Sequence, residues 1–438
     1  MIWLLLILSL NAVIPTKWLR VAGVPLGDGI SIAVYGLYLM RACVTRRRVG
    51  QVYWPWGLCM IVVTISPLIA LLANRDAEVL VLTLRQTMHY LFIVLLFVEV
   101  KTLKHYRALL SMYLGVALVS SVALQVYHKF PELANPQFAD ASFRGLVAGE
   151  PRIFTSGAGY VLFAAVGLMV LLSESNLLRV GSVVATEAVL LSGLVWTFIR
   201  VFFVVLVVCL FVHVTLSVFG RRRSRRFAVS MCSVAIVLGL GVQSSSSVDS
   251  LVVRLGGLDK VVMAYEENGD TVAWRVAEAT AALESMQGPL EAAFGKFASR
   301  FGHLDYVSIG VHIGWIGIYY HFGAVGVVAF GIMVFTLMRR LVRQYWALRN
   351  SGDRFLRLLV RAHLLLWIAF TLVAFGGGSF ASGGTIIMLA ILWHGTSLIE
   401  VERMQAPSTV PWRMGETRAL YWNPRPRIGI AAGQQSLS

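Results

Sequence analysis

Twelve apolar segments, most of them close to the length of a membrane-spanning helix, recur along the 438-residue chain. An α-helix needs about 20 predominantly apolar residues to cross the hydrocarbon core of a bilayer. Hydrophobic residues make up 58% of the chain, whereas a soluble globular protein is usually about 45–50% apolar. We therefore predict an all-α, polytopic membrane protein with about 12 transmembrane helices. The segments are residues 2–14, 27–44, 53–73, 79–99, 108–128, 157–172, 180–196, 201–219, 227–242, 314–337, 358–375 and 385–399.

Lysine and arginine residues are distributed unevenly between the connections that join these segments. With the N-terminus in the cytoplasm, 25 of them lie inside, 12 lie outside and one, Arg85, lies within a helix. Basic residues close to transmembrane helices favour the cytoplasmic side. We therefore expect both termini in the cytoplasm. The net charge of +16 then reflects membrane orientation and contact with anionic lipid head groups, and not nucleic-acid binding.

Two connections are much longer than the others, and both lie on the predicted outer side. They are residues 129–156 and residues 243–312. A long loop among short ones is a common place for a functional site. We predict a transmembrane helical domain over residues 1–400 with the periplasmic loop 243–312 inserted as a cap, followed by a cytoplasmic tail over residues 401–438.

The longer outer loop contains the sequence DTVAWRVAEATAALESMQ at residues 270–287. Apolar residues recur there at helical spacing, and Arg275 lies away from them. This pattern predicts an amphipathic helix that rests on the membrane or on the top of the bundle. Gly288 and Pro289 are expected to end it. The predicted apolar face consists of Val272, Val276, Ala279, Leu283 and Met286.

Three candidate functional side chains fall on the predicted outer side. They are Arg200 in a tight turn between two helices, Arg275 in the amphipathic helix and His312 at the mouth of the tenth helix. Each also has a structural interpretation, as a side chain at the lipid interface or, for Arg275, as the partner of Glu278. Their order along the chain is a reason to consider them together.

The order is an arginine turn, a long outer loop with an arginine in an amphipathic helix, a Gly-Pro break, and a histidine before a glycine-rich span. This order resembles the O-antigen ligase and O-antigen polymerase superfamily over about residues 150–330. The corresponding stretches are AWRVAEATAALESMQGPLEAAFGKF and VHIGWIGIYYHFGAVGVVAF. Two positions depart from the family: Ile313 stands where it usually has Asn, and TFIRVF surrounds Arg200 in place of a Ser-Arg-Gly turn.

The resemblance implies an enzyme of the bacterial inner membrane with its active site at the periplasmic face. Its donor would be a polyprenyl-diphosphate-linked glycan, and its acceptor a hydroxyl of a glycan or glycolipid. Arg275 and Arg200 would bind the diphosphate, because a guanidinium forms paired hydrogen bonds with phosphate oxygens. His312 would accept the proton of the attacking hydroxyl. No cofactor and no metal ion is implied.

Further ionisable residues are candidates for contact with the donor. Arg152, Arg85 and Arg254 are each able to bind a phosphate group. Arg85 and His89 are four residues apart in the fourth helix, where ionisable side chains are costly and commonly functional. Glu187 falls within a helix and has no partner evident from the sequence.

The segment after His312 is expected to form one helix over residues 314–337 with many small residues. If His312 lies in the first turn of this helix, the helix dipole disfavours the imidazolium and keeps the ring neutral. The small residues predict close approach of neighbouring helices or of a lipid tail. They are the glycines at 310, 314, 317, 323 and 326.

Four functions fit these patterns. A polysaccharide polymerase is favoured over an O-antigen ligase by the departures at Ile313 and around Arg200, and a chain-length regulator is then a candidate partner. A metal-dependent glycosyltransferase would use Asp76 and Glu78, which also suit an ordinary helix N-terminus. A lipid-sugar flippase or transporter fits the helix count, although the sequence shows no internal repeat.

Overall fold

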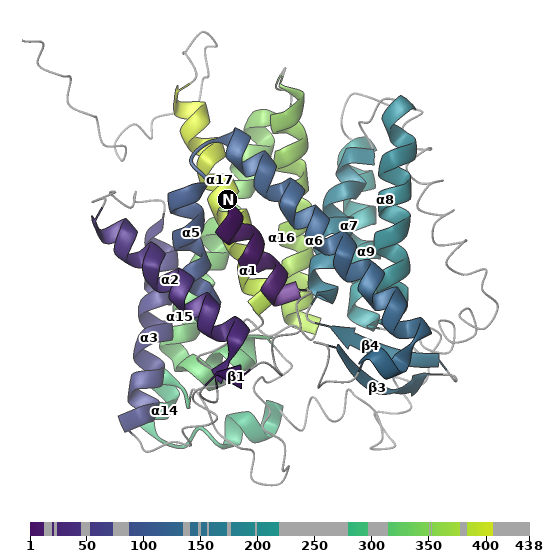
Figure 1. The fold of residues 1–438 in the computed structure, drawn as a ribbon. Coiled ribbons are helices and arrows are strands. Elements are labelled where there is room, and N and C mark those ends of the chain that lie inside the picture. The colour runs from purple at the N-terminus through teal and green to yellow at the C-terminus, as the bar shows by residue number, and fades with distance from the viewer. Residues whose placement is uncertain are drawn as a thin grey trace, which may run out of the picture.

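A bundle of helices dominates the structure, with two short antiparallel hairpins at one end of it (Figure 1). The prediction of a helical membrane protein is confirmed in this coarse form. The computed structural model describes residues 1–12, 20–21, 24–44, 53–72, 87–134, 141–147, 150–155, 157–172, 177–197, 199–218, 279–296, 314–349, 351, 353–376 and 383–405.

Helices coincide with eleven of the twelve expected apolar segments, and segment 227–242 lies outside the described residues. The first group is α1 (Ile2–Ala12), α2 (Leu26–Val44), α3 (Trp54–Leu72), the 3-10 turn η2 (Met88–Leu91), α5 (Phe92–Glu99) and α6 (Leu103–Lys129). The second is α7 (Ala158–Leu172), α8 (Leu177–Val195), α9 (Arg200–Val218), α14 (Pro289–Phe294), α15 (Gly314–Leu348), α16 (Arg354–Gly376) and α17 (Gly383–Gln405). Of these helices, α14 corresponds to no expected segment.

Four of the described helices have the length and the apolar character needed to cross a membrane. They comprise residues Leu103–Lys129, Gly314–Leu348, Arg354–Ala374 and Gly384–Glu402. Shorter apolar helices occur within α3, η2 with α5, α7, α8 and α9. Large apolar side chains are exposed on the peripheral helices, for example Ile32 of α2, Leu68 of α3 and Val328 of α15. Such side chains suit contact with lipid chains.

Helix α7 is surrounded by other helices, because it contacts α6, α8, α9, α16 and α17. It is apolar on all sides, as expected of a helix that is surrounded by others. Small residues allow the close crossings nearby. A Cβ atom at Gly157 would overlap Ser120 of α6, and one at Gly193 of α8 would overlap Ser121. Adding a side chain at either glycine would therefore separate these helices.

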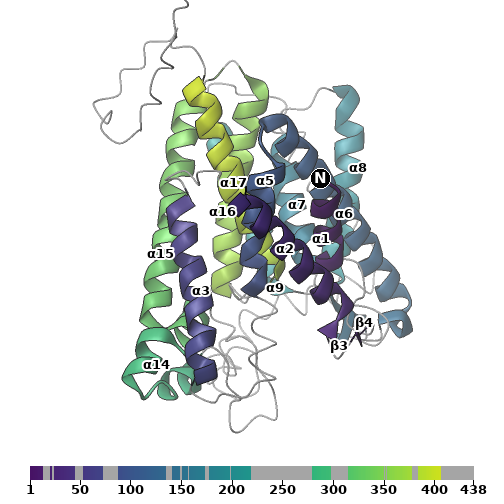
Figure 2. The same cartoon turned by 60° about the vertical axis from the view of Figure 1, so that its left-hand side comes forward.

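Helix ends that were predicted to lie on the cytoplasmic side are found together at one end of the bundle. The α-amino group of Met1 lies 2.7 Å from a carboxylate oxygen of Glu99 at the end of α5. The guanidinium of Arg107, near the start of α6, lies 4.1 Å from the centre of the Phe355 ring, near the start of α16. In both views, α14, β3 and β4 lie at the opposite end (Figures 1 and 2).

The shorter predicted outer loop is folded in the residues that the structure describes. It contains the turn η3 (Pro131–Ala134) and an antiparallel hairpin of β3 (Ala141–Val147) and β4 (Glu150–Thr155), which contacts α6. A second hairpin joins β1 (Arg20–Val21) to β2 (Val24–Pro25) before α2. The predicted all-α fold did not include these strands. They are short, and the ladder of β3 and β4 is irregular between Phe143 and Leu146, so their pattern in the sequence is weak.

Candidate functional site

Helix α15 is interrupted near the end of the bundle that carries α14. At Gly323 the backbone has φ 62° and ψ −165°, so the span Gly314–Leu348 consists of two helices that meet at a break. A positive φ with an extended ψ is a conformation that only glycine adopts readily. The prediction of one continuous helix over residues 314–337 is therefore wrong at this position.

The break packs against the end of α14 through a second glycine of the same kind. Gly295 follows α14 and has φ 82° and ψ 173°. A Cβ atom at Gly295 would overlap the backbone of His321 and Phe322, and one at Gly323 would overlap the backbone of Ala293. The amide of Lys296 donates a hydrogen bond of 2.8 Å to the carbonyl oxygen of Tyr320. We call this contact of two backbones the glycine junction.

The predicted amphipathic helix also reaches α15 in its described part, where residues 279–284 are helical. Ala282 and Tyr320 are each 1% exposed and pack in one cluster. Of the predicted apolar face, Ala279 is 5% exposed and Met286 packs against this cluster, whereas Leu283 is 47% exposed. The helix ends before Gly288, and Pro289 begins α14, as the Gly-Pro pair predicted.

The residues predicted to carry the chemistry lie mostly beyond the described part of the chain. Arg152 lies in β4 and Arg200 is the first residue of α9, but their side chains are not among those described. The structure brings together the segments that follow Arg275 and His312, at Ala282 and Tyr320. Outside the described residues are Arg85, Arg254, Arg275 and His312.

The presence of His89 within the bundle is explained in part by a hydrogen-bond partner that the sequence did not indicate. The ring Nδ1 lies 3.0 Å from the hydroxyl of Tyr35 on α2, and both side chains are buried. This hydrogen bond satisfies a polar group within the bundle, where leaving it without a partner would be costly. A structural contact between α2 and η2 therefore accounts for at least this side of His89.

Tyrosine and histidine side chains form a recurring contact, buried or partly buried, between segments that are far apart in the sequence. In each case a hydroxyl meets a ring nitrogen at 2.8–3.0 Å. A phenol and an imidazole satisfy each other without introducing a net charge, so these contacts suit an apolar interior. The three pairs are Tyr35 with His89, Tyr53 with His394, and Tyr106 with His363.

The pair of Tyr106 and His363 depends on Gly395 of α17, which predicts a stability effect. A Cβ atom at Gly395 would overlap the Tyr106 hydroxyl and approach His363. We expect Gly395→Ala to separate α17 from α6 and to lower the melting temperature in detergent. Gly36→Ala on α2, where a Cβ atom would meet nothing within 4 Å, is the control. Equal melting temperatures for the two variants would contradict the proposed crowding.

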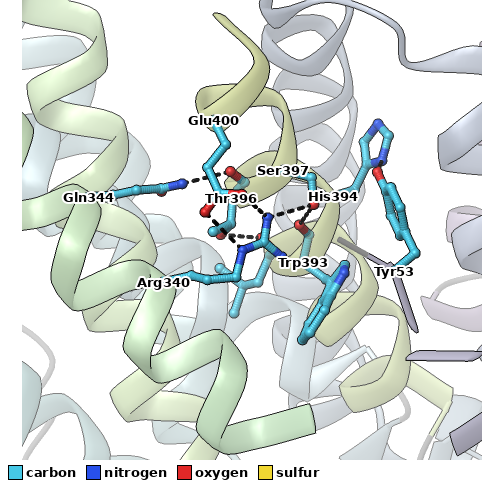
Figure 3. A network of polar contacts seen from close by, with 9 residues as sticks. Tyr53, Arg340, Gln344, Trp393, His394, Thr396, Ser397 and Glu400 are labelled. Carbon is cyan, nitrogen blue, oxygen red and sulfur yellow. Dashed lines mark hydrogen bonds and ion pairs between the residues drawn. The ribbon is translucent and has the colours of Figure 1, made fainter. Parts of the chain in front are cut away.

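A charged network joins α15 to α17 at the other end of the bundle (Figure 3). The guanidinium of Arg340 donates to both carboxylate oxygens of Glu400, at 3.0 and 2.8 Å, and to the hydroxyl of Ser397 at 3.0 Å. It also lies 5.2 Å from the centre of the Trp393 ring. One turn further along α15, Gln344 donates to the carbonyl oxygen of Thr396 at 2.7 Å. The two helices are thus joined by paired, directional bonds.

Nothing in the sequence distinguishes Arg340 from the other basic residues that are expected on the cytoplasmic side. The structure shows it only 8% exposed, so it is an interhelical residue and not a contact with lipid head groups. The sequence does contain a related pattern: Arg340 follows the apolar segment 314–337, and Glu400 follows the apolar segment 385–399. A charged residue at each of two helix ends is compatible with a pair, but the sequence alone does not show that they meet.

Glu187 stands out among the buried charged residues of the described chain. It lies in α8, is 1% exposed, and neither carboxylate oxygen has a hydrogen-bond partner there. Helix α8 packs on α6 and α7, so the carboxyl group is enclosed by the bundle. An enclosed carboxylate without a partner is costly. The sequence indicates no partner for Glu187, and no side chain in the described part of the structure forms a hydrogen bond with it.

Clusters of metal-binding side chains do not occur within the described ranges. No three histidine, cysteine, aspartate or glutamate residues come together there in a way that suits a metal ion. Asp76 and Glu78, the pair on which a metal-dependent reaction would rest, lie outside these ranges.

Comparison with known proteins does not assign the chain to a family. No protein-family model and no curated protein matches it. The function is therefore inferred from the residues of this chain and from the arrangement of its helices.

Proposed function

We propose that the protein is a polysaccharide polymerase of the bacterial inner membrane. It transfers a glycan from a polyprenyl diphosphate to a sugar hydroxyl at the periplasmic face, without a metal ion or a cofactor. The chain has about 12 spans, with both termini in the cytoplasm and the loop 243–312 outside. The gathering of the predicted inner helix ends at one end of the bundle, opposite α14, supports this orientation.

The observation that carries the proposal is the contact between the two segments that the candidate residues precede. Arg275 comes four residues before Ala279, and His312 comes two residues before α15. Ala282 and Tyr320 pack together, and the glycine junction lies next to them. This contact supports an arrangement in which a phosphate-binding arginine and a basic imidazole serve one site.

The reaction follows from the chemistry of these groups. The acceptor oxygen attacks the anomeric carbon, and its proton passes to the neutral imidazole of His312. The bond from the anomeric carbon to the diphosphate oxygen breaks, and its electron pair leaves with the polyprenyl diphosphate. Arg275 and Arg200 stabilise the negative charge on that leaving group. Arg152, Arg85 and Arg254 are further candidates for holding the donor.

The paired hydrogen bonds of Arg275 predict a specific mutational result. We expect Arg275→Lys to lose most of the activity although the charge is kept, because an ammonium group does not bind two phosphate oxygens in the same paired geometry. Initial rates of polymer formation would measure this loss. Arg349→Lys, at the other end of α15, is the matched control and should keep the wild-type rate. Near-normal turnover of Arg275→Lys would argue against a paired contact.

The function is tested with purified protein in detergent and one polyprenyl-diphosphate oligosaccharide, with EDTA present and no other acceptor. A ladder of oligosaccharide multiples on a gel is the expected result. Product only after lipid A core is added would make the protein an O-antigen ligase. Loss of all product in EDTA, with recovery when a divalent metal is restored, would favour a metal-dependent glycosyltransferase.

A lipid-glycan flippase or transporter is the second candidate, and two observations favour it. Broken transmembrane helices are common in transporters, and α15 is broken at Gly323. Glu187 is an enclosed carboxyl group of the kind found in proton-coupled carriers. Movement of the lipid-linked glycan across proteoliposomes, unchanged by His312→Ala and lost in Glu187→Gln, would support this candidate against the polymerase.

A further inference from the structure

Two glycines in a conformation that other residues rarely adopt lie at the glycine junction, one on each of the two backbones that meet there. Gly295 has φ 82° and Gly323 has φ 62°. They are the two glycines with positive φ in the described chain. Each lacks a Cβ atom where the backbone of the other segment passes. The junction therefore needs glycine at both positions for conformation and for space.

The junction also compensates for the interruption of α15. A broken helix leaves carbonyl and amide groups without their usual partners, which is costly at membrane depth unless protein covers them. The Lys296 amide binds the Tyr320 carbonyl oxygen at 2.8 Å, so the chain after α14 takes the place of one missing helical bond. The Lys296 ammonium lies 3.6 Å from a carboxylate oxygen of Glu291, which ties it back to α14.

The position of the junction relates it to the proposed reaction. On one side, the chain before α14 contains the packed residue Ala282 and, further back, Arg275. On the other side, the outer part of α15, residues 314–322, begins two residues after His312. Figure 2 shows α14 beside the lower ends of α3 and α15, and both helices contact it. The junction thus fixes both segments to the same part of the bundle.

We propose that Gly295 and Gly323 are positioning residues that hold residues 279–296 in register with residues 314–322, the described segments that follow Arg275 and His312 in the chain, for transfer of the glycan. This inference rests on the proposed function. The break lets residues 314–322 leave the axis of the inner part of α15, and α14 fixes the direction they take. A side chain at either glycine separates the two backbones and so displaces residues 289–296 from residues 314–322.

The first test measures the junction without reference to activity. Hydrogen exchange by mass spectrometry compares the wild-type protein with Gly323→Ala and Gly295→Ala. We expect faster exchange in peptides covering residues 289–296 and 314–322 in both variants, and no change in peptides from α6. Gly331→Ala, in the same helix and with no atom within 4 Å of a Cβ, is the matched control and should exchange as the wild type does. Unchanged exchange in the two junction variants would overturn the proposal.

The second test separates positioning from loss of stability. Gly395→Ala adds a methyl group at a crowded crossing remote from the junction, so it reports what destabilisation alone does to turnover. We expect kcat of Gly323→Ala to fall at least tenfold below that of Gly395→Ala per folded molecule, with KM for the donor changed less than threefold. Equal kcat values for these two variants would overturn the positioning role.

The two proposals fail in different ways. If the wild-type protein forms no product, the proposed function is wrong, and with it any positioning for glycan transfer, whatever hydrogen exchange shows. If the wild-type protein is active and exchange at the junction is unaffected by the substitutions, the function stands and the junction proposal alone is wrong.

Discussion

Replacing His312 with alanine is expected to abolish the ladder of polymer products while leaving the protein folded. A general base contributes about 10²–10⁴-fold to a rate, because it removes a proton as the new bond forms. The acceptor hydroxyl is a poor nucleophile while it keeps its proton, so little turnover should remain. Initial rates with the polyprenyl-diphosphate oligosaccharide measure the loss, and KM for the donor should change little because the donor is held by arginines.

A control substitution at a second histidine tests whether the loss of activity is specific to His312. His105 is exposed near the start of α6, at the other end of the bundle, and His105→Ala should keep the wild-type rate. His312→Gln is a further variant that retains a polar side chain but no basic ring, and it should be as inactive as His312→Ala. If either His312 variant made polymer at more than a tenth of the wild-type rate, a role as the base would be ruled out.

The positions of the helices were accessible from the sequence because hydropathy reports directly on burial in lipid. Segments such as 108–128 and 157–172 therefore match α6 and α7 to within a few residues. The break in α15 was not accessible in this way. Gly323 is one of several glycines in its segment, and glycine is common in membrane helices for reasons of packing. What makes Gly323 different is the backbone of Ala293 and Phe294, which approaches it from another part of the chain.

Interhelical partners were the other feature that the sequence did not reveal. Counting basic residues predicts the side of the membrane, but the count treats Arg340 and Arg343 alike. The structure buries Arg340 against Glu400, whereas Arg343 is exposed on the same helix. His89 and Tyr35 show the same difficulty, since 54 residues separate them. A contact of this kind depends on which helices become neighbours, and that depends on the whole bundle.

Removing the guanidinium of Arg340 is expected to give the largest loss of stability among the substitutions of described residues. Arg340→Ala deletes three hydrogen bonds and leaves the Glu400 carboxylate without its partner. Breaking a buried ion pair costs about 3–5 kcal/mol, and because the Glu400 side chain is 26% exposed we expect about 2 kcal/mol here. A lower melting temperature in detergent would show it. Arg343 lies on the exposed face of α15, so Arg343→Ala should change the free energy of unfolding by less than about 1 kcal/mol.

The same pair allows a test of whether charge or packing holds α15 to α17. Arg340→Met with Glu400→Leu removes both charges while keeping side chains of similar volume, and such exchanges are commonly neutral or stabilising. We expect the double variant to recover most of the stability that Arg340→Ala loses. A double variant as unstable as Arg340→Ala would instead mean that the directional bonds of the guanidinium set the contact between the two helices, since an apolar pair would then fail to replace them.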